Sequence, residues 1–164
     1  MNVLDTDTAA FIQTGVSISV ASANAERLAT MARGMGCKLI DGGQRVCVFV
    51  QRSQSAELLA NIAASRRVAC VFSLPSSNRT VQLKGMDAQC GPFDPADLPL
   101  VQQHIQDFTA QVVPLGTPEA IMRQLLHDRP DDLVTVTFTP SASFSQTPGP
   151  KAGEALPHAA GDRA

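Results

Sequence analysis

The sequence predicts an α+β fold, built as a mostly antiparallel β-barrel with a few flanking helices. Three observations predict it: apolar residues alternate with small or polar ones in several stretches, turn signals separate these stretches, and helical spacing is confined to three segments. Strands joined by short turns pair antiparallel, and a closed or partly open barrel removes their edges. The 164 residues suffice for one domain with a core.

Three of the predicted strands precede the first predicted helix. Val16, Ile18 and Val20 alternate with small polar residues, which is typical of a strand with one buried face. The next extended stretch contains Gly34 and Gly36, and glycine inside a strand marks a bulge or a close approach. The expected strands are residues 16–21, 28–40, 45–51, 68–74, 79–89 and 133–139.

Three helices are expected between or after these strands. Ser55 is predicted to cap the first, which runs to residue 65. The second spans residues 95–112, and the third opens with Thr117 and Pro118. The third helix is expected to bury four apolar side chains, namely Ile121, Met122, Leu125 and Leu126.

The chain divides into a domain over residues 1–144 and a Pro/Gly-rich tail over residues 145–164. The tail has few large apolar residues, so its end, from about Glu154, is expected to be disordered.

Composition and charge exclude several classes of function. The net charge is −2, and there is no Trp or Tyr to stack on bases, so a nucleic-acid partner is not expected. No apolar run reaches the roughly 18 residues of a membrane span. Met1 to Thr8 carries two Asp and no Lys or Arg, unlike a secretory signal. We therefore expect a cytoplasmic protein without a membrane partner.

The four cysteines, Cys37, Cys47, Cys70 and Cys90, form no CxxC pair, and no His lies at finger spacing. Buried, reduced thiols are the favoured interpretation, with a zinc site or a catalytic thiol as the open alternative. No metal site and no catalytic side chain are predicted. A hydrolase or thiol enzyme has no GxSxG, HExxH or Cys-His signature to support it.

Two basic stretches stand out as candidate binding elements. Arg33 and Lys38 are five residues apart, and so are Arg79 and Lys84. Residues five apart in a flat strand point to opposite faces, so each pair shares a ligand only if the strand bulges between them. The glycines of the first stretch would permit such a bulge. The alternative is that all four are solvated surface charges.

Over about residues 16–89 the sequence resembles the FMN-binding split-barrel family that includes pyridoxamine 5'-phosphate oxidase. Arg33, four intervening residues and Lys38, then Asp41 and the strand to Gln51, follow the family order. A second family pattern, Arg-x-Val-x-x-x-Gly, is matched at residues 79–85, and the helix at 55–65 is followed by a similar strand. Residues 144–153 also resemble a tail found in smaller members.

This resemblance implies a split barrel, a homodimer with FMN at the interface, and oxidoreductase activity on an unidentified small molecule. It places basic and hydroxyl residues on the phosphate and polar residues along the ring edge. The start of the first helix would offer free N–H groups to the phosphate. The implied cofactor-binding residues are Arg33, Lys38, Val50, Gln51, Arg52, Ser53, Ser55, Arg79, Gln82 and Lys84.

The sequence departs from the family at two places. The Lys of the Ser-Arg-Lys or Ser-x-Lys element before the helix is absent, and only Arg52 supplies charge there. The Arg-x-His element of the oxidase's substrate site is missing too, so oxidation of pyridoxamine phosphate is not expected. These departures leave a second hypothesis open: a split-barrel binding module with a haem-handling, sensory or structural role that has lost or weakened flavin binding.

Overall fold

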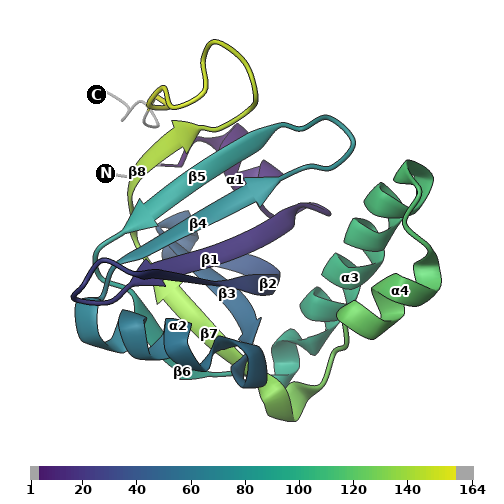
Figure 1. Cartoon of the computed structure of the whole chain (residues 1–164), viewed down its shortest axis with the longest axis horizontal. Coiled ribbons are helices and arrows are strands. Elements are labelled where there is room, and N and C mark those ends of the chain that lie inside the picture. Colours follow the sequence, from purple (N-terminus) through teal and green to yellow (C-terminus); the bar gives the residue numbers. More distant parts are fainter. Residues whose placement is uncertain (1–3, 158–164) are drawn as a thin grey trace.

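The computed structural model describes residues 4–157, which contain one eight-stranded sheet with four α-helices around it (Figure 1). The strand order is β6-β7-β3-β2-β1-β4-β5-β8, and every ladder is antiparallel. Within these residues no ladder joins β6 to β8, so the curled sheet stays open. The predicted α+β, antiparallel split-barrel fold is confirmed.

The strands are β1 (Ser17–Ala23), β2 (Ala29–Ile40), β3 (Arg45–Gln51), β4 (Val68–Ser73), β5 (Thr80–Gly85), β6 (Gln89–Pro92), β7 (Leu133–Phe138) and β8 (Pro140–Ser145). The helices are α1 (Thr6–Phe11), α2 (Arg52–Ser65), α3 (Leu98–Val112) and α4 (Glu119–Leu125).

The predicted strand at residues 79–89 is interrupted by a corner and forms two strands, β5 and β6. Asp87 lies in this corner, and its Oδ1 accepts a hydrogen bond from the backbone N–H of Thr139 at 2.8 Å. That contact ties the corner to the junction of β7 and β8 and turns the chain out of the β5 ladder. The short helix α1 and the strand β8 were not predicted at all.

Two details of the predicted helices were wrong. α2 begins three residues before Ser55, so Ser55 lies inside the helix, buried, and does not cap it. In α4 only Met122 is buried, with Leu126 just after the helix, whereas Ile121 is 46% and Leu125 52% exposed. A helix of two turns that contacts the rest of the protein with only a narrow strip of its surface buries fewer side chains than its apolar pattern predicts.

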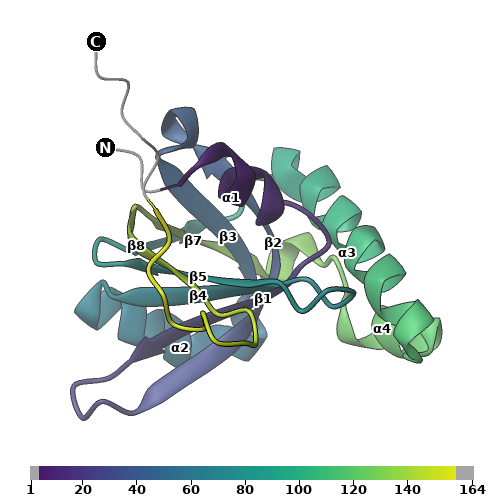
Figure 2. The same cartoon turned by 90° about the horizontal axis from the view of Figure 1, so that it is seen from above.

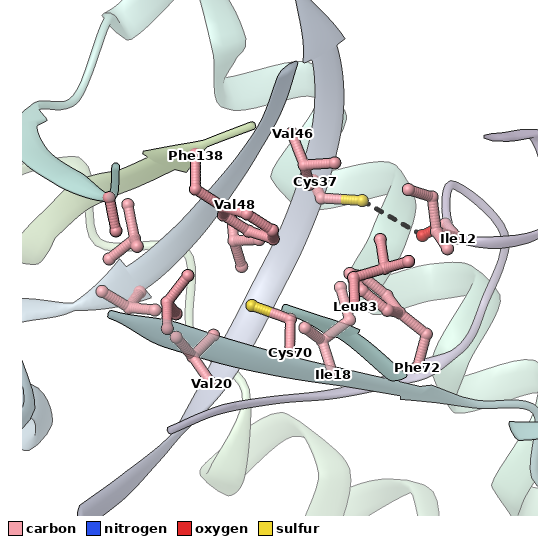
Figure 3. Packing of buried hydrophobic residues seen from close by; sticks show 14 of the residues in the cluster. Ile12, Ile18, Val20, Cys37, Val46, Val48, Cys70, Phe72, Leu83 and Phe138 are labelled. Atoms are coloured by element: carbon pink, nitrogen blue, oxygen red, sulfur yellow. Dashed lines mark hydrogen bonds between the residues drawn. The ribbon is translucent and has the colours of Figure 1, made fainter. Parts of the chain in front are cut away.

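The main core fills the inner side of the curled sheet. Figure 3 shows Val46, Val48 and Phe138 on one side of this space facing Val20 and Cys70 on the other. The remaining labelled members are Ile12, Ile18, Cys37, Phe72 and Leu83, and Sγ of Cys37 donates to the carbonyl of Ile12 at 3.1 Å. From α2, Leu58 and Ile62 belong to the same cluster, so this helix covers one end of the barrel.

The outer side of the sheet is divided into a covered half and an open half. Over β2, β3 and β7, a second cluster joins Met35 and Phe49 to Val101 and Phe108 of α3 and Met122 of α4. Over β1, β4 and β5 no helix formed by residues 4–157 crosses the outer face, which Figure 1 views directly. Figure 2 shows α3 and α4 lying to one side, beside β2.

The described part of the tail folds back onto β8. Ser145 N–H donates to the carbonyl of Glu154 at 2.9 Å, and Leu156 N–H donates to the carbonyl of Ser143 at 2.9 Å. An antiparallel bridge pairs Phe144 with Ala155. Residues 154–156 thus lie along the outer edge of β8. Residues 158–164, on which part of the expected disorder falls, lie outside the described residues.

Candidate functional site

A β-bulge in β2 turns Arg33 and Lys38 to the same side of the sheet. Between Gly34, opposite Val50, and Cys37, opposite Val48, β2 has one residue more than β3. Arg33 pairs with the outward-facing Ser19, and Lys38 pairs with Cys47 of the outer cluster. The bulge that the glycines were expected to permit is therefore present, and both basic side chains leave the outer face.

Helix α3 nevertheless keeps these two side chains apart. Gly36, with φ of 122°, lies under the helix, where an added Cβ would come within 3.2 Å of Cβ of His104. Arg33 lies over the Phe108 ring, whereas Lys38 donates to both carboxylate oxygens of Asp97, just before the helix, at 2.7 Å each. Eleven residues of helix correspond to about 16 Å. The two cations do not face one open site.

The start of α2, predicted to receive a phosphate, is hydrogen-bonded to a carboxylate of the chain itself. Ser53 donates from its backbone N–H to Oδ1 of Asp132 at 2.9 Å and from its hydroxyl to Oδ2 at 2.6 Å. The nearby Gln51 is buried, with Nε2 3.2 Å from Nδ1 of His127. The backbone N–H and the hydroxyl of Ser53, and the positive end of the helix dipole, are thus already directed to an anionic group of the chain itself.

The other predicted binding residues of this segment, Val50, Arg52 and Ser55, do not point to a common site. Val50 points into the main core, and Arg52 is exposed on the first turn of α2. Ser55 is 2% exposed, and its hydroxyl finds no hydrogen-bond partner among residues 4–157.

On the far side of the barrel, Arg79 forms an ion pair with Asp7. Its guanidinium lies 4.1 Å from the centre of the Phe11 ring, so Arg79 anchors α1.

The open outer face carries a continuous row of cross-strand neighbours from four adjacent strands. Residues directly opposite in antiparallel strands point to the same face. The ladder registers align Arg33, Ser19, Val71 and Gln82 in one row, and Phe144 of β8 continues it. With strands about 4.8 Å apart, Arg33 and Gln82 are separated by roughly 14 Å.

A second row of cross-strand neighbours lies beside the first on the open outer face. It consists of Met31, Ala21, Ala69 and Lys84, in the order β2, β1, β4, β5. Met31 and Lys84 are exposed at its ends, and the alanines between them are half-buried. The Lys84 ammonium lies 5.0 Å from the centre of the Phe144 ring. The open face is therefore a floor of small side chains with cations at two edges.

The titratable groups agree with a site that lacks a nucleophile. Burial raises the pKa of the Cys37 thiol to about 12 and also raises the pKa of Cys70 and Cys47, so these thiols stay protonated at neutral pH. The hydrogen bond from Ser53 lowers the pKa of Asp132, and the hydrogen bond to Asp97 raises that of Lys38. The cysteines Cys37, Cys47 and Cys70 are buried as predicted, whereas Cys90 is exposed.

No group of three or more His, Cys, Asp or Glu side chains that could hold a metal ion occurs in the described part of the chain. Within the same residues, no helix is both long and apolar enough to cross a membrane.

Sequence reasoning missed four residues that define this geometry. The predicted helix at residues 95–112 contains Asp97, and Asp132 directly precedes the predicted strand at residues 133–139, but nothing in their spacing shows that they meet Lys38 and Ser53. Ser19 lay within the predicted alternation of β1, on the outward positions, and Val71 lay within the predicted strand at 68–74. Only the register of β1 with β2 and β4 reveals that both align with Arg33.

No family model matches the sequence, and no curated protein sequence is similar to it. Solved structures are similar in fold. A chain described as an F420 reductase superposes with a TM-score of 0.56 at 14% identity, over 85% of this chain and 98% of that one. HupZ of Group A Streptococcus gives 0.53 at 10% identity, over 92% and 99%.

A third structure comes from Lactobacillus delbrueckii and is described as a putative pyridoxamine 5'-phosphate oxidase. Its TM-score is 0.52 at 14% identity, over 88% of this chain and 95% of that one. Identities this low concern the fold alone. The resemblance noted from the sequence is thereby confirmed at the level of architecture: this chain has the split-barrel fold of pyridoxamine 5'-phosphate oxidase-related proteins.

Proposed function

We propose that the protein binds a flavin, FMN in the first instance, on the open outer face of β2, β1, β4 and β5. A second copy of the chain would cover the cofactor, and the pair would act as an oxidoreductase on a small molecule. The observation that carries this proposal is the row from Arg33 through Ser19 and Val71 to Gln82.

The ring half of a flavin fits this face. A flat aromatic system needs an apolar floor that it can approach closely, with a few polar groups to orient it. Ser19, Ala21, Ala69 and Val71 provide a floor of small side chains. Arg33 and Gln82 stand at its two sides, where they would donate hydrogen bonds to polar atoms of the ring edge. The bound flavin would supply the electron transfer, and the chain would position it.

The phosphate half does not fit at the place that the family resemblance implies. Lys38 is neutralised by Asp97, and both donors of Ser53 are directed to Asp132. A phosphate there would have to displace a carboxylate that already holds the same hydrogen bonds. Both contacts are charge-assisted and short, which makes displacement costly.

The same two carboxylates favour a second candidate function, a split-barrel binding module without a flavin. In such a module, Asp97 and Asp132 would accept the hydrogen bonds that Lys38 and Ser53 would otherwise give to the cofactor phosphate. The structure described as HupZ shows that the fold is not restricted to chains described as oxidases or reductases.

Equilibrium titration with FMN and with riboflavin, followed by quenching of flavin fluorescence, tests the proposal. We expect the purified chain to bind both. Ser19→Trp places a bulky ring in the middle of the face and should abolish binding without unfolding the protein. Gln89→Trp, exposed on β6 at the opposite end of the sheet, is the matched control. Absence of binding to the unaltered chain at excess of both flavins would contradict the proposal and favour the module.

A further inference from the structure

Two adjoining hollows lie where the open face meets the end of α2. The first, of about 270 Å³, is lined by Ser22, Val68 and Arg67 together with the alanines Ala21, Ala23, Ala29 and Ala69. The second, of about 470 Å³, is lined by Ala23, Asn24, Ala25, Arg27, Ala64, Ser65 and Arg67. Figures 1 and 2 both show the hairpin between β1 and β2 beside α2. Ala23 and Arg67 line both hollows, so the two adjoin.

These hollows belong to the open face. Ala21 and Ala69 are the central pair of the row that ends at Met31 and Lys84. A ligand lying on the floor of small side chains can therefore extend directly into the first hollow.

The charge of the hollows is entirely positive. Arg27 and Arg67 are their only charged lining residues. Within residues 4–157 neither guanidinium forms an ion pair, in contrast to Lys38 and Arg79. Arginine presents a planar set of donors that matches a phosphate. The lining thus offers two unpaired guanidinium groups and no competing carboxylate.

The backbone that carries Arg67 is held in place by hydrogen bonds. The hydroxyl of Ser22 donates to the carbonyl of Arg67 at 2.7 Å, and the N–H of Arg67 donates to Oγ of Ser65 at 3.2 Å. In the β1–β2 turn, the N–H of Arg27 donates to the carbonyl of Asn24 at 3.0 Å. Both arginines are thus carried by backbone that hydrogen bonds hold in place.

We propose that Arg27 and Arg67 bind the phosphate group of the ligand that occupies the open face. The site rests on the proposed function where the ligand is FMN, and it moves the phosphate from the start of α2 to the opposite end of that helix. A phosphate site at Arg27 and Arg67 also explains why Lys38 and Ser53 are paired with carboxylates of the chain, because these two donors are then not needed to bind the phosphate. A phosphorylated substrate lying beside the flavin would present the same chemistry.

The test compares Arg67→Gln and Arg27→Gln with the unaltered chain in titrations with FMN, riboflavin and inorganic phosphate. Arg66→Gln is the matched control, since Arg66 is the neighbouring residue, lines neither hollow and donates to the carbonyl of Asp87. Loss of one charge-assisted contact should weaken FMN binding about ten- to a hundredfold. Riboflavin, which lacks the phosphate, should bind all variants equally.

The other outcomes separate the possible sources of the phosphate. If Arg67→Gln leaves FMN binding unchanged but removes the rise in melting temperature caused by inorganic phosphate, the anion belongs to the substrate and the site stands. If the unaltered chain binds no flavin but phosphate still stabilises it through Arg67, the proposed function fails and the anion site stands. Equal effects of Arg66→Gln and Arg67→Gln, or no effect of either hollow variant on any probe, would overturn the inference.

Discussion

Lys38 and Asp97 form an ion pair in which the ammonium donates to both carboxylate oxygens, and it joins the bulged strand β2 to the start of α3. The Asp97 side chain is 12% exposed and that of Lys38 30% exposed, so the pair is only partly screened by water. The ion pair adds a polar connection between the sheet and α3 to the apolar contacts that Met35 and Phe49 make with this helix.

Breaking this pair should destabilise the fold. We expect Asp97→Asn to lower the free energy of unfolding by about 1–3 kcal/mol, because it leaves a partly buried ammonium without its partner. Urea denaturation of Asp97→Asn, Lys38→Met and the double variant gives the coupling energy. The double variant should lose less than the sum of the two single losses. Strictly additive losses would show that the ion pair does not couple the two residues.

Asp132 should act as a cap for α2 and not as a competitor of the cofactor. Asp132→Ala removes the acceptor of two hydrogen bonds from Ser53 and should cost about 1 kcal/mol of stability. Flavin affinity should stay within about twofold if the phosphate lies at the other end of the helix. Thermal denaturation and FMN titration measure both effects, with Asp131→Ala as the neighbouring control. A large gain in FMN affinity would instead place the phosphate at Ser53.

Acid should destabilise the protein through His104, which is buried under Phe108 and beside Gly36. Burial lowers the pKa of His104 to about 4 from its ordinary 6.5. The positive charge of Arg33 also lowers this pKa, whereas the negative charge of Asp107 raises it. Above pH 6.5 neither the folded nor the unfolded state binds the proton. Between pH 6.5 and 4 only the unfolded state binds it, so stability falls as the pH falls, by up to roughly 3 kcal/mol.

The variant His104→Gln isolates this effect. Whatever its stability at pH 7.5, its further loss between pH 7 and pH 4.5 should be smaller than that of the unaltered chain. Urea denaturation at a series of pH values provides the comparison. Parallel pH profiles for the two proteins would assign the acid sensitivity to other groups.

The open outer face should hold two copies of the chain together. Val71→Glu introduces a charge at the centre of the face, between Ser19 and Gln82. Burying that charge without a partner is unfavourable, so the variant should be monomeric under conditions in which the unaltered chain is a dimer. Sedimentation velocity measures the change, and Gln89→Glu on β6 is the control of equal charge. A monomeric unaltered chain would remove the basis for a shared cofactor.

The fold and most of the strands were predictable from local patterns, because alternation and turn residues can be recognised in consecutive positions of the sequence. The strand β8 and the corner between β5 and β6 were not predicted. The bulge was also foreseeable from Gly34 and Gly36. What the sequence does not show is which distant side chains meet. Lys38 and Asp97 are 59 residues apart, and Ser53 and Asp132 are 79 apart. Each pair depends on how α3, α4 and the connection to β7 are placed, so a site inferred from β2 and α2 alone misses the carboxylates.

The folded-back tail has a consequence for handling the protein. β8 ends the sheet, and residues 154–156 supply partners to Ser143 and Ser145 along its outer edge. Shortening the chain to residue 145 would uncover a strand edge whose free N–H and C=O groups can recruit another chain. Such a shortened protein should keep its barrel but self-associate on concentration, so solubility depends on a segment that contributes little to the core.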